Sequence, residues 1–395
     1  MKRSLKITGT AVLAATALVL AGCSKPASTS STTTPVATTA AGSSSSAGPS
    51  SDPGTSSDTG TSSDTGTSSD TGTTSAASSA TSSALSSTSG SSGGGGTGKS
   101  LSVGFFGFAK ANSFAQAAWA GVQEAAAANN ATATFIDSNF DGPTQVNQLQ
   151  DAVTSKRYDV VVIQANDGTA ITPAVKQALA AGIKVVVEFT PIGGKFDTIE
   201  PQVDGVISIV DTPTNNGAGL AELGLGACKK LAVDPCKVAY LQGFANYPLD
   251  AARTQAVEDG LKAGGADLVA SVVGGYTADA GRTAFQNVLQ ANPDVNVVIG
   301  SSQAIAGAAA LAGDKNILFV GNGGSTQAFD GIKSGKWFGT YNIPEKTEGK
   351  TAAELGLKAA RGETVPTATD ARDLTPYQAL LTADKIAGQT ADYSD

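Results

Sequence analysis

Residues 101–129 have the sequence LSVGFFGFAKANSFAQAAWAGVQEAAAAN. An apolar run at 101–107 is followed, after a short polar loop, by an alanine-rich run of helical period at 113–129. The same order recurs at 133–137 and 144–155. Continuous apolar strands that are separated by helices are typical of parallel sheets covered on both faces. The pattern therefore predicts a doubly wound α/β fold.

The alternation of strand and helix continues to the end of the chain. Later strands are predicted at 159–164, 183–189, 205–210, 237–242, 267–273, 296–300, 317–321 and 339–342. This number of strands fits two sheets better than one, and the polar break Asp211-Thr212-Pro213 precedes a long helical stretch at 215–231. We therefore predict two lobes with the first boundary at Asp211. Because open parallel sheets bind ligands at the carboxyl ends of their strands, we expect a ligand cleft between the lobes.

The chain begins with the features of a lipoprotein signal peptide at residues 1–22. An apolar run at 7–22 follows three basic residues and ends in Leu20-Ala21-Gly22-Cys23. A basic start, a short apolar core and small residues before the cut mark a secretory signal, and the run is too short for a lasting membrane span. We predict a lipidated Cys23 that anchors the chain on the extracytoplasmic face of the cell membrane. An ordinary signal cleavage site beside a cysteine is the alternative.

Residues 23–98 are almost entirely Ser, Thr, Gly, Ala and Pro, and they include three tandem copies of TSSDTG at 55–72. Large side chains are almost absent, so little offsets the entropy lost when such a backbone becomes ordered. We therefore predict that this segment is a disordered tether.

The composition excludes several classes of function. The chain has no histidine, which removes the Ser-His-Asp arrangement, the Cys-His pair and every histidine metal site. No two carboxylates stand out as an acid-base pair. The formal net charge of −8 opposes binding to a phosphate backbone. We expect no enzymatic activity, no metal and no nucleic-acid partner.

Two cysteines, Cys228 and Cys236, lie eight residues apart between a helical pattern and a strand pattern. In an oxidising compartment we expect a disulfide between them, which would fix this helix-to-strand corner. Two buried unpaired thiols are the alternative, and a thiol-metal site is a further one, although two cysteines make only half a zinc site.

Short motifs follow several of the predicted strands. They are Asn112-Ser113-Phe114, Gln164-Ala165-Asn166-Asp167-Gly168, Ala251-Ala252-Arg253 and Tyr341-Asn342-Ile343-Pro344. With these motifs, residues 101–374 resemble type I periplasmic binding proteins of the ribose-binding kind, the receptors of sugar ABC importers. The resemblance implies two doubly wound parallel-sheet lobes joined by a three-crossing hinge, with the ligand cleft between them. The implied lobes are residues 99–210 plus 343–373 and residues 211–342 plus 374–395.

The resemblance also implies a site for a molecule with many hydroxyl groups. Asn112 would bond a hydroxyl, and Phe114 would stack on a C–H surface of the ligand. Asp167, or Asn166 beside it, would accept hydrogen bonds from hydroxyls, and Arg253 would donate a fork of bonds from the second lobe.

Several positions depart from the pattern of the resembled family. Phe189 stands in place of an arginine and Asn322 in place of a late aspartate, while Ser301 and Gln303 occupy a loop that commonly carries Asn-Asp. Asn342 stands where the family often has Gln or Asn. Together with the five residues of the preceding paragraph, these positions make up the predicted site. The site carries fewer charged side chains than a pentose site of the resembled family, so a different sugar, a polyol or a smaller uncharged metabolite fits it.

Structural roles remain open for the same residues. Asn112 and Asn166 are suited to capping helices, and Arg253 to a surface ion pair. Phe114 and Phe189 are suited to a hydrophobic core.

We predict a monomeric, lipid-anchored substrate-binding protein that captures a sugar or polyol-like molecule and delivers it to an ABC permease, with no cofactor. A ligand-sensing subunit for a membrane kinase or chemoreceptor is an alternative, as is a binding protein for a non-sugar solute. A DNA-binding repressor with the same fold is disfavoured by the signal peptide, the acidic charge and the lack of a basic helix-turn-helix segment.

Overall fold

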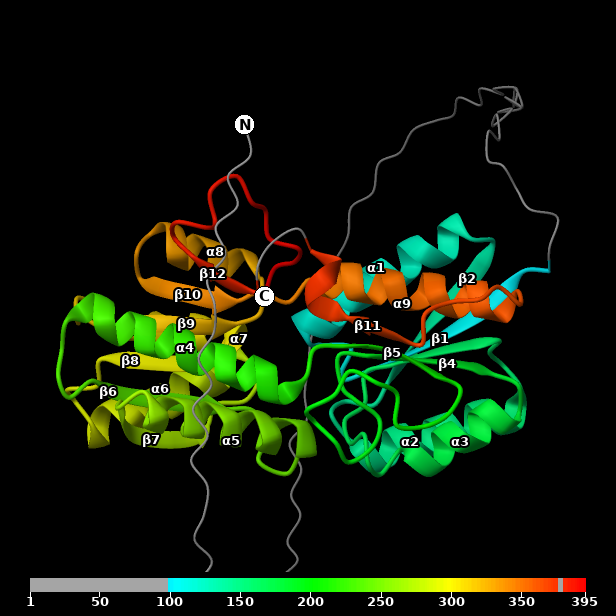
Figure 1. The fold of residues 1–395 in the computed structure, drawn as a ribbon, viewed down its shortest axis with the longest axis horizontal. Coiled ribbons are helices and arrows are strands. Elements are labelled where there is room, and N and C mark those ends of the chain that lie inside the picture. The colour runs from blue at the N-terminus through cyan, green and yellow to red at the C-terminus, as the bar shows by residue number, and fades with distance from the viewer. Residues whose placement is uncertain (1–98, 376–378) are drawn as a thin grey trace, which may run out of the picture. The chain divides into compact units, whose positions relative to one another are not determined.

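The computed structural model describes residues 99–375 and 379–395. The predicted signal peptide, Cys23 and the predicted tether lie outside the described residues. Within the described part of the chain, no helix has both the length and the apolar character that a membrane crossing needs. Two six-stranded sheets, each with helices on both faces, form two lobes (Figure 1).

The N-terminal lobe contains a sheet whose strands are all parallel, in the order β11-β5-β4-β3-β1-β2. Its strands are β1 Leu101–Gly107, β2 Ala131–Asp137, β3 Val160–Ile163, β4 Lys184–Glu188, β5 Val206–Val210 and β11 Ala368–Asp370. Its helices are α1 Ser113–Ala128, α2 Gly142–Ser155, α3 Thr172–Ala180 and α9 Glu345–Ala360, with the 3-10 turn Ala371–Leu374 after β11. Buried residues of α1 and α9 pack on one face of the sheet, and those of α2 and α3 pack on the other.

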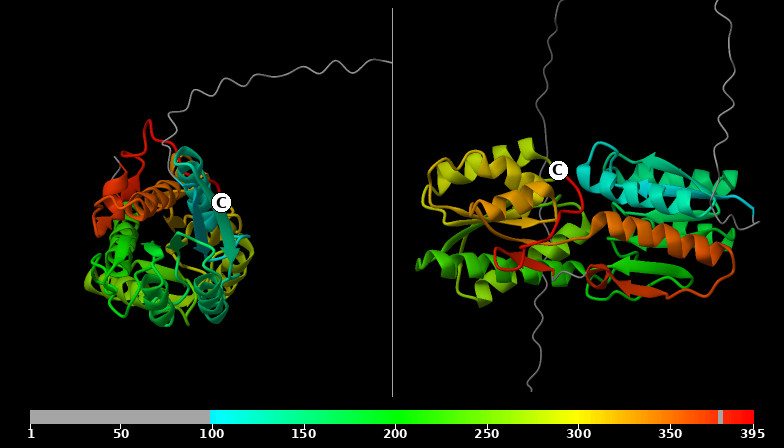
Figure 2. Two further views of the ribbon diagram at one scale, coloured as in Figure 1. Left: turned by 90° about the vertical axis from the view of Figure 1, so that its right-hand side faces the viewer. Right: turned by 90° about the horizontal axis from the view of Figure 1, so that it is seen from above.

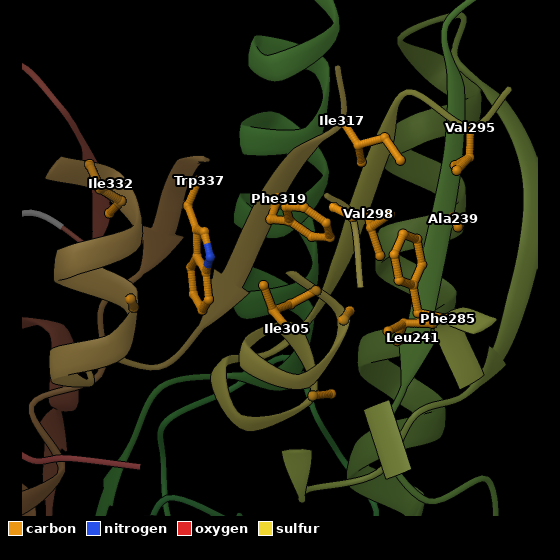
Figure 3. Packing of buried hydrophobic residues seen from close by; sticks show 14 of the residues in the cluster. Ala239, Leu241, Phe285, Val295, Val298, Ile305, Ile317, Phe319, Ile332 and Trp337 are labelled. Carbon is orange, nitrogen blue, oxygen red and sulfur yellow. The ribbon is translucent and has the colours of Figure 1, made fainter. Parts of the chain in front are cut away.

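The C-terminal lobe contains a sheet in the order β12-β10-β9-β8-β6-β7, in which only β12 is antiparallel to its neighbour. Its strands are β6 Lys237–Gln242, β7 Asp267–Val273, β8 Val297–Ser301, β9 Leu318–Asn322, β10 Trp337–Tyr341 and β12 Leu380–Thr382. Its helices are α4 Pro213–Leu231, α5 Pro248–Ala263, α6 Ala278–Ala291, α7 Ser302–Ala309 and α8 Thr326–Lys333. One face carries a core that includes Phe285, Phe319 and Trp337 (Figure 3), and α4 and α5 cover the other face.

The predicted fold class, two doubly wound α/β lobes, is confirmed. The apolar runs identified in the sequence form β1 to β10, although β2 and β10 each begin two residues earlier than predicted. The short strands β11 and β12 were not expected, because three residues are too few to give a periodic signal. The predicted disulfide between Cys228 and Cys236 is also confirmed, and it joins the end of α4 to the start of β6.

Local sequence explains where the helices begin and how closely they pack. The side chains of Asn112 and Asp141 accept the backbone N–H three residues later and so cap α1 and α2. Two glycines let α1 and α9 touch backbone to backbone. A Cβ at Gly121 would lie 2.0 Å from the Lys346 carbonyl oxygen, and one at Gly349 would lie 2.2 Å from that of Ala118. Any larger residue at either position would push these helices apart.

The chain passes between the lobes three times, from β5 to α4, from β10 to α9, and from β11 to β12. Polar contacts tie these crossings together. The Tyr341 hydroxyl donates a hydrogen bond to the Asp211 carboxylate, and Arg372 Nε lies 3.6 Å from Asp211 Oδ1. Burial raises the pKa of Asp211 to about 6. The exact lobe boundaries, 99–210 plus 343–373 and 211–342 plus 374–395, stay a prediction.

Three buried carboxyl groups lie beside the second crossing. Glu188 ends β4, and Glu345 and Glu348 lie in the first turn of α9; at most 1% of each is exposed, and their oxygens lie within 4.8 Å of one another. The Gln164 side-chain amide donates a 2.5 Å hydrogen bond to Glu345. Burial raises the pKa of Glu188 to about 8 and the pKa values of Glu345 and Glu348 well above their usual range. The folded protein therefore holds protons here at neutral pH.

These carboxyl groups make stability depend on pH. Glu188 has a pKa of about 8 in the folded protein and an ordinary value of 4.5, so the folded state binds more protons between these values. Its stabilising contribution is complete below about pH 4.5 and is lost as the pH rises through 8, at up to about 1.4 kcal/mol per pH unit. We expect Glu188→Gln to reduce this loss in urea unfolding measured from pH 5.5 to 8.5. The exposed control Glu363→Gln should behave as the wild type. If the free energy of unfolding fell equally with pH in all three proteins, the raised pKa assigned to Glu188 would be contradicted.

Candidate ligand-binding site

A cleft lies between the lobes, where the loops after the strands of both sheets meet. Its empty space, including the opening to solvent, is about 530 Å³. One wall comes from the loops that follow β1 to β4, and the other from the loops and strand ends at β6 to β9 and the start of α5. The cleft therefore lies where ligands bind to open parallel sheets.

Aromatic side chains form much of the lining of this cleft. Six of them contribute: Phe108, Phe114, Phe140, Phe189, Tyr247 and Tyr276. The rings of Phe114 and Phe189 meet edge to face at 4.9 Å, and those of Phe140 and Tyr276 stack across the two lobes at 6.2 Å. Aromatic faces of this kind pack well against the C–H surfaces of a ligand.

Two of these aromatic residues have an uncommon backbone conformation. Phe140 and Phe189 have φ angles of 59° and 63°, in the left-handed region that bulky residues rarely adopt. Such strain persists where the surrounding structure demands it, and it is concentrated at ligand sites. Phe189 directly follows β4, and Phe140 is the third residue after β2, so both lie in strand-end loops.

A buried ion pair from α5 lines the opposite wall. Arg253 Nη1 lies 2.7 Å from Asp250 Oδ1, and at most 4% of either side chain is exposed. The spacing of three residues places both on one face of α5, which begins at Pro248. The Tyr276 hydroxyl donates to Asp250, and the backbone N–H of Phe244 donates to Asp250 Oδ2 at 2.7 Å. Burial raises the pKa of Asp250, whereas these donors and Arg253 lower it and favour the carboxylate.

Some polar atoms of the cleft lining are buried without a hydrogen-bond partner. They are Arg253 Nε and Thr190 Oγ1. The Arg253 guanidinium also lies 5.8 Å from the centre of the Phe189 ring, which comes from the other lobe. Because buried polar groups are nearly always paired in folded proteins, these atoms are suited to bonding a ligand hydroxyl.

Direct hydrogen bonds between the lobes show that the cleft is closed. Asn112 Nδ2 donates to the Tyr276 carbonyl oxygen at 3.4 Å, and Gln303 Nε2 donates to Ser113 Oγ at 3.2 Å. The Tyr247 hydroxyl donates to the carbonyl oxygen of Phe140.

The structure brings most of the predicted site residues to this cleft. The lining includes Asn112, Phe114, Asn166, Phe189, Arg253, Ser301, Gln303 and Asn322. Asn342 lies instead in an adjoining cavity toward the hinge, which Phe189 and Arg253 also line. Asp167 lines neither cavity. Its carboxylate accepts the backbone N–H groups of Thr169 and Ala170, each at 2.9 Å.

Some of these residues also have a structural role. Asn112 Oδ1 accepts the Ala115 N–H at 3.0 Å, so Asn112 caps α1 as well as lining the cleft. Ser301 caps α7 in the same way, and the amides of Asn322 and Asn216 bond each other. Arg253 is paired in the interior, so the surface ion pair considered for it is wrong.

Sequence reasoning missed several cleft residues. Phe108, Phe140, Tyr247, Asp250 and Tyr276 all line the cleft. Four of them follow strands, and Asp250 lies three residues before Arg253. An aromatic residue in each strand-end loop was a signal available in the sequence.

Comparisons with known proteins agree with this geometry. A family model described as a periplasmic binding protein domain matches residues 103–364. The ribose import binding protein of Bacillus subtilis is 26% identical over 68% of this chain and 85% of its own length. The D-ribose/D-allose-binding protein of Pseudomonas aeruginosa is 25% identical over 63% and 77%.

Solved structures show the same fold. An ABC transporter solute-binding protein from Mycobacterium smegmatis with bound glycerol is 25% identical, with a TM-score of 0.61 over 75% of this chain and 100% of that one. The Caulobacter myo-inositol binding protein is 18% identical, with a TM-score of 0.63 over 74% and 97%. The chain therefore belongs to the type I periplasmic binding protein family, whose members are non-enzymatic, extracytoplasmic solute-binding proteins of ABC transporters.

Proposed function

We propose that this protein captures an uncharged molecule rich in hydroxyl groups, a sugar or a polyol, between its two lobes and delivers it to an ABC permease. The proposal rests on the combination of an aromatic lining with the ion pair of Asp250 and Arg253 in the wall of the cleft. Asp250 and Arg253 neutralise each other, so a charged ligand would find no free counter-charge in them. The unpartnered Arg253 Nε and Thr190 Oγ1 suit hydroxyl groups.

The relatives support the same class of ligand. Two are named for binding ribose, or ribose and allose, and the solved Mycobacterium smegmatis protein holds glycerol. We therefore include sugars and small polyols among the candidate ligands.

Capture follows from the two-lobed architecture. A ligand that contacts the aromatic residues of one lobe and Arg253 of the other binds the closed arrangement more tightly than an open one. This difference in affinity shifts the protein toward closure by a hinge motion at the three crossings. The permease would then recognise the closed shape.

We further propose that Cys23 carries the lipid anchor and that residues 23–98 tether the lobes to the membrane. The basis is the signal sequence and the composition of the segment. A tether of this composition allows the lobes to search for the permease while the chain stays at the extracytoplasmic face.

A ligand panel tests the proposed function. We expect D-ribose, D-allose, myo-inositol or glycerol to raise the melting temperature of the full chain, whereas charged amino acids at the same concentration do not. A ligand at a hundred times its Kd stabilises the folded state by about 2.7 kcal/mol. A shift with charged amino acids alone would contradict the proposal.

Arg253→Lys tests the role of the guanidinium. Lysine keeps the charge beside Asp250 and so avoids a buried unpaired carboxylate, but it removes the planar fork and Nε. We expect the binding free energy of the ligand found in the panel, measured by calorimetry, to become less favourable by about 1–3 kcal/mol. The exposed control Arg282→Lys should bind normally. An unchanged Kd for Arg253→Lys would remove Arg253 from the site.

Cys23→Ser tests the anchor. Serine cannot carry the thioether-linked lipid, so we expect the variant in the soluble fraction after cell fractionation, with the unchanged protein in the membrane fraction. Retention of the variant in membranes would contradict lipidation at Cys23.

A further inference from the structure

Residues 391–395, which we call the strap, follow β12 and lie where the two lobes meet (Figure 2). The strap is attached to the C-terminal lobe by its backbone. The Tyr393 carbonyl oxygen accepts hydrogen bonds from Thr326 N at 2.8 Å and Thr326 Oγ1 at 3.1 Å. The Gln327 side chain bonds the backbone N–H and C=O of Asp395, each at 2.9 Å. These partners lie in the first turn of α8.

The side chains of the strap reach the N-terminal lobe. Asp392 Oδ2 accepts the backbone N–H groups of Lys346 at 2.7 Å and Thr347 at 3.2 Å, in the first turn of α9. Asp395 Oδ1 accepts a hydrogen bond from Ser113 Oγ at 3.2 Å, at the first residue of α1. Each carboxylate thus lies at a helix N-terminus, where the helix dipole favours negative charge.

The strap also contacts a residue that lines the ligand cleft, Phe114. The Tyr393 ring meets the Phe114 ring edge to face at 6.0 Å, and its hydroxyl lies 3.4 Å from Ser302 Oγ. A Cβ at Gly323 would lie 2.4 Å from the Tyr393 hydroxyl oxygen, so this ring packs directly on the loop after β9. Strap and cleft therefore share a wall at Phe114.

The two contacts with the N-terminal lobe differ in their distance from the hinge. Helix α9 begins directly after the second crossing, so the Asp392 contact lies close to the hinge. Ser113 follows the cleft residue Asn112, and its hydroxyl also accepts the interlobe hydrogen bond from Gln303. A hinge rotation displaces groups at the cleft more than groups beside the axis. The hydrogen bond between Ser113 and Asp395 is thus one that opening would break.

We propose that the strap is a latch that stabilises the closed arrangement of the lobes, with Asp395 and Ser113 as its closing contact. Asp395 and Tyr393 are then positioning residues, because they act on the ligand site through Ser113 and Phe114. The effect of the latch on ligand affinity rests on the proposed function, whereas its effect on lobe closure in the unliganded protein does not.

The test measures lobe closure directly in the full chain without ligand. The exposed residues Lys176 of the N-terminal lobe and Gln255 of the C-terminal lobe are each replaced by an azide-bearing residue, and a dye pair is attached for single-molecule energy transfer. We expect Asp395→Ala to raise the ratio of open to closed molecules by roughly 10- to 150-fold, the effect of one hydrogen bond to a charged group. Ser113→Ala should raise the ratio at least as much, because it also removes the acceptor of the Gln303 hydrogen bond, and adding Asp395→Ala to it should change little.

Matched controls separate a latch from a general loss of structure. Asp384→Ala removes an exposed carboxylate of the same lobe whose side-chain partner is the nearby Thr382, and it should leave the ratio unchanged. Equal ratios for the wild type, Asp395→Ala and Ser113→Ala would overturn the proposal, as would a wild type with no closed population. Strictly additive effects would show that the two residues act separately and would overturn the closing contact. None of these readouts needs a ligand, so failure of the sugar panel would leave them interpretable.

Discussion

The structure depends on one constraint, which is that every strand except β12 is parallel to its neighbours and that the central strands of each sheet are buried on both faces. Parallel strands need helical crossovers, so every strand-to-helix loop emerges at the same edge of its sheet. In this chain the carboxyl edges of the two sheets face each other, and the loops after β1 to β4 meet those of the second sheet. The cleft, its aromatic lining and the ion pair on α5 are consequences of that convergence.

The cleft and the hinge region differ in how their buried charged groups are neutralised. In the cleft, Asp250 and Arg253 balance each other at 2.7 Å, and aromatic rings surround them. Beside the hinge, Glu188, Glu345 and Glu348 are buried together, and no lysine or arginine within the described ranges forms an ion pair with them. Burial raises the pKa values of these carboxyl groups, which favours their protonated, uncharged form. The packing of α9 against β4 therefore depends on pH.

The sequence predicted the fold because its signal is repeated many times and each strand is a continuous apolar run. It predicted much of the cleft lining through the family resemblance of the motifs in the loops after the strands, where Asn112, Asn166 and Phe189 lie. Residues such as Tyr276 and Phe140 were missed because their importance comes from a stacking contact between lobes more than a hundred residues apart in sequence. Asp167 was expected beside Asn166 in the site, but its carboxylate instead accepts hydrogen bonds from two backbone N–H groups of the turn that follows it. Competition between local capping and ligand binding is decided by geometry, which a linear pattern does not contain.

The central claim is that both lobes hold one uncharged, hydroxyl-rich ligand between aromatic rings and Arg253. The most direct measurement is a crystal structure of the protein with the sugar or polyol that raises its melting temperature most. The account predicts ligand density between the lobes, with a C–H face of the ligand against Phe114 or Phe189 and a hydroxyl hydrogen-bonded to Arg253. Ligand density outside this cleft, or contacts with one lobe alone, would contradict it.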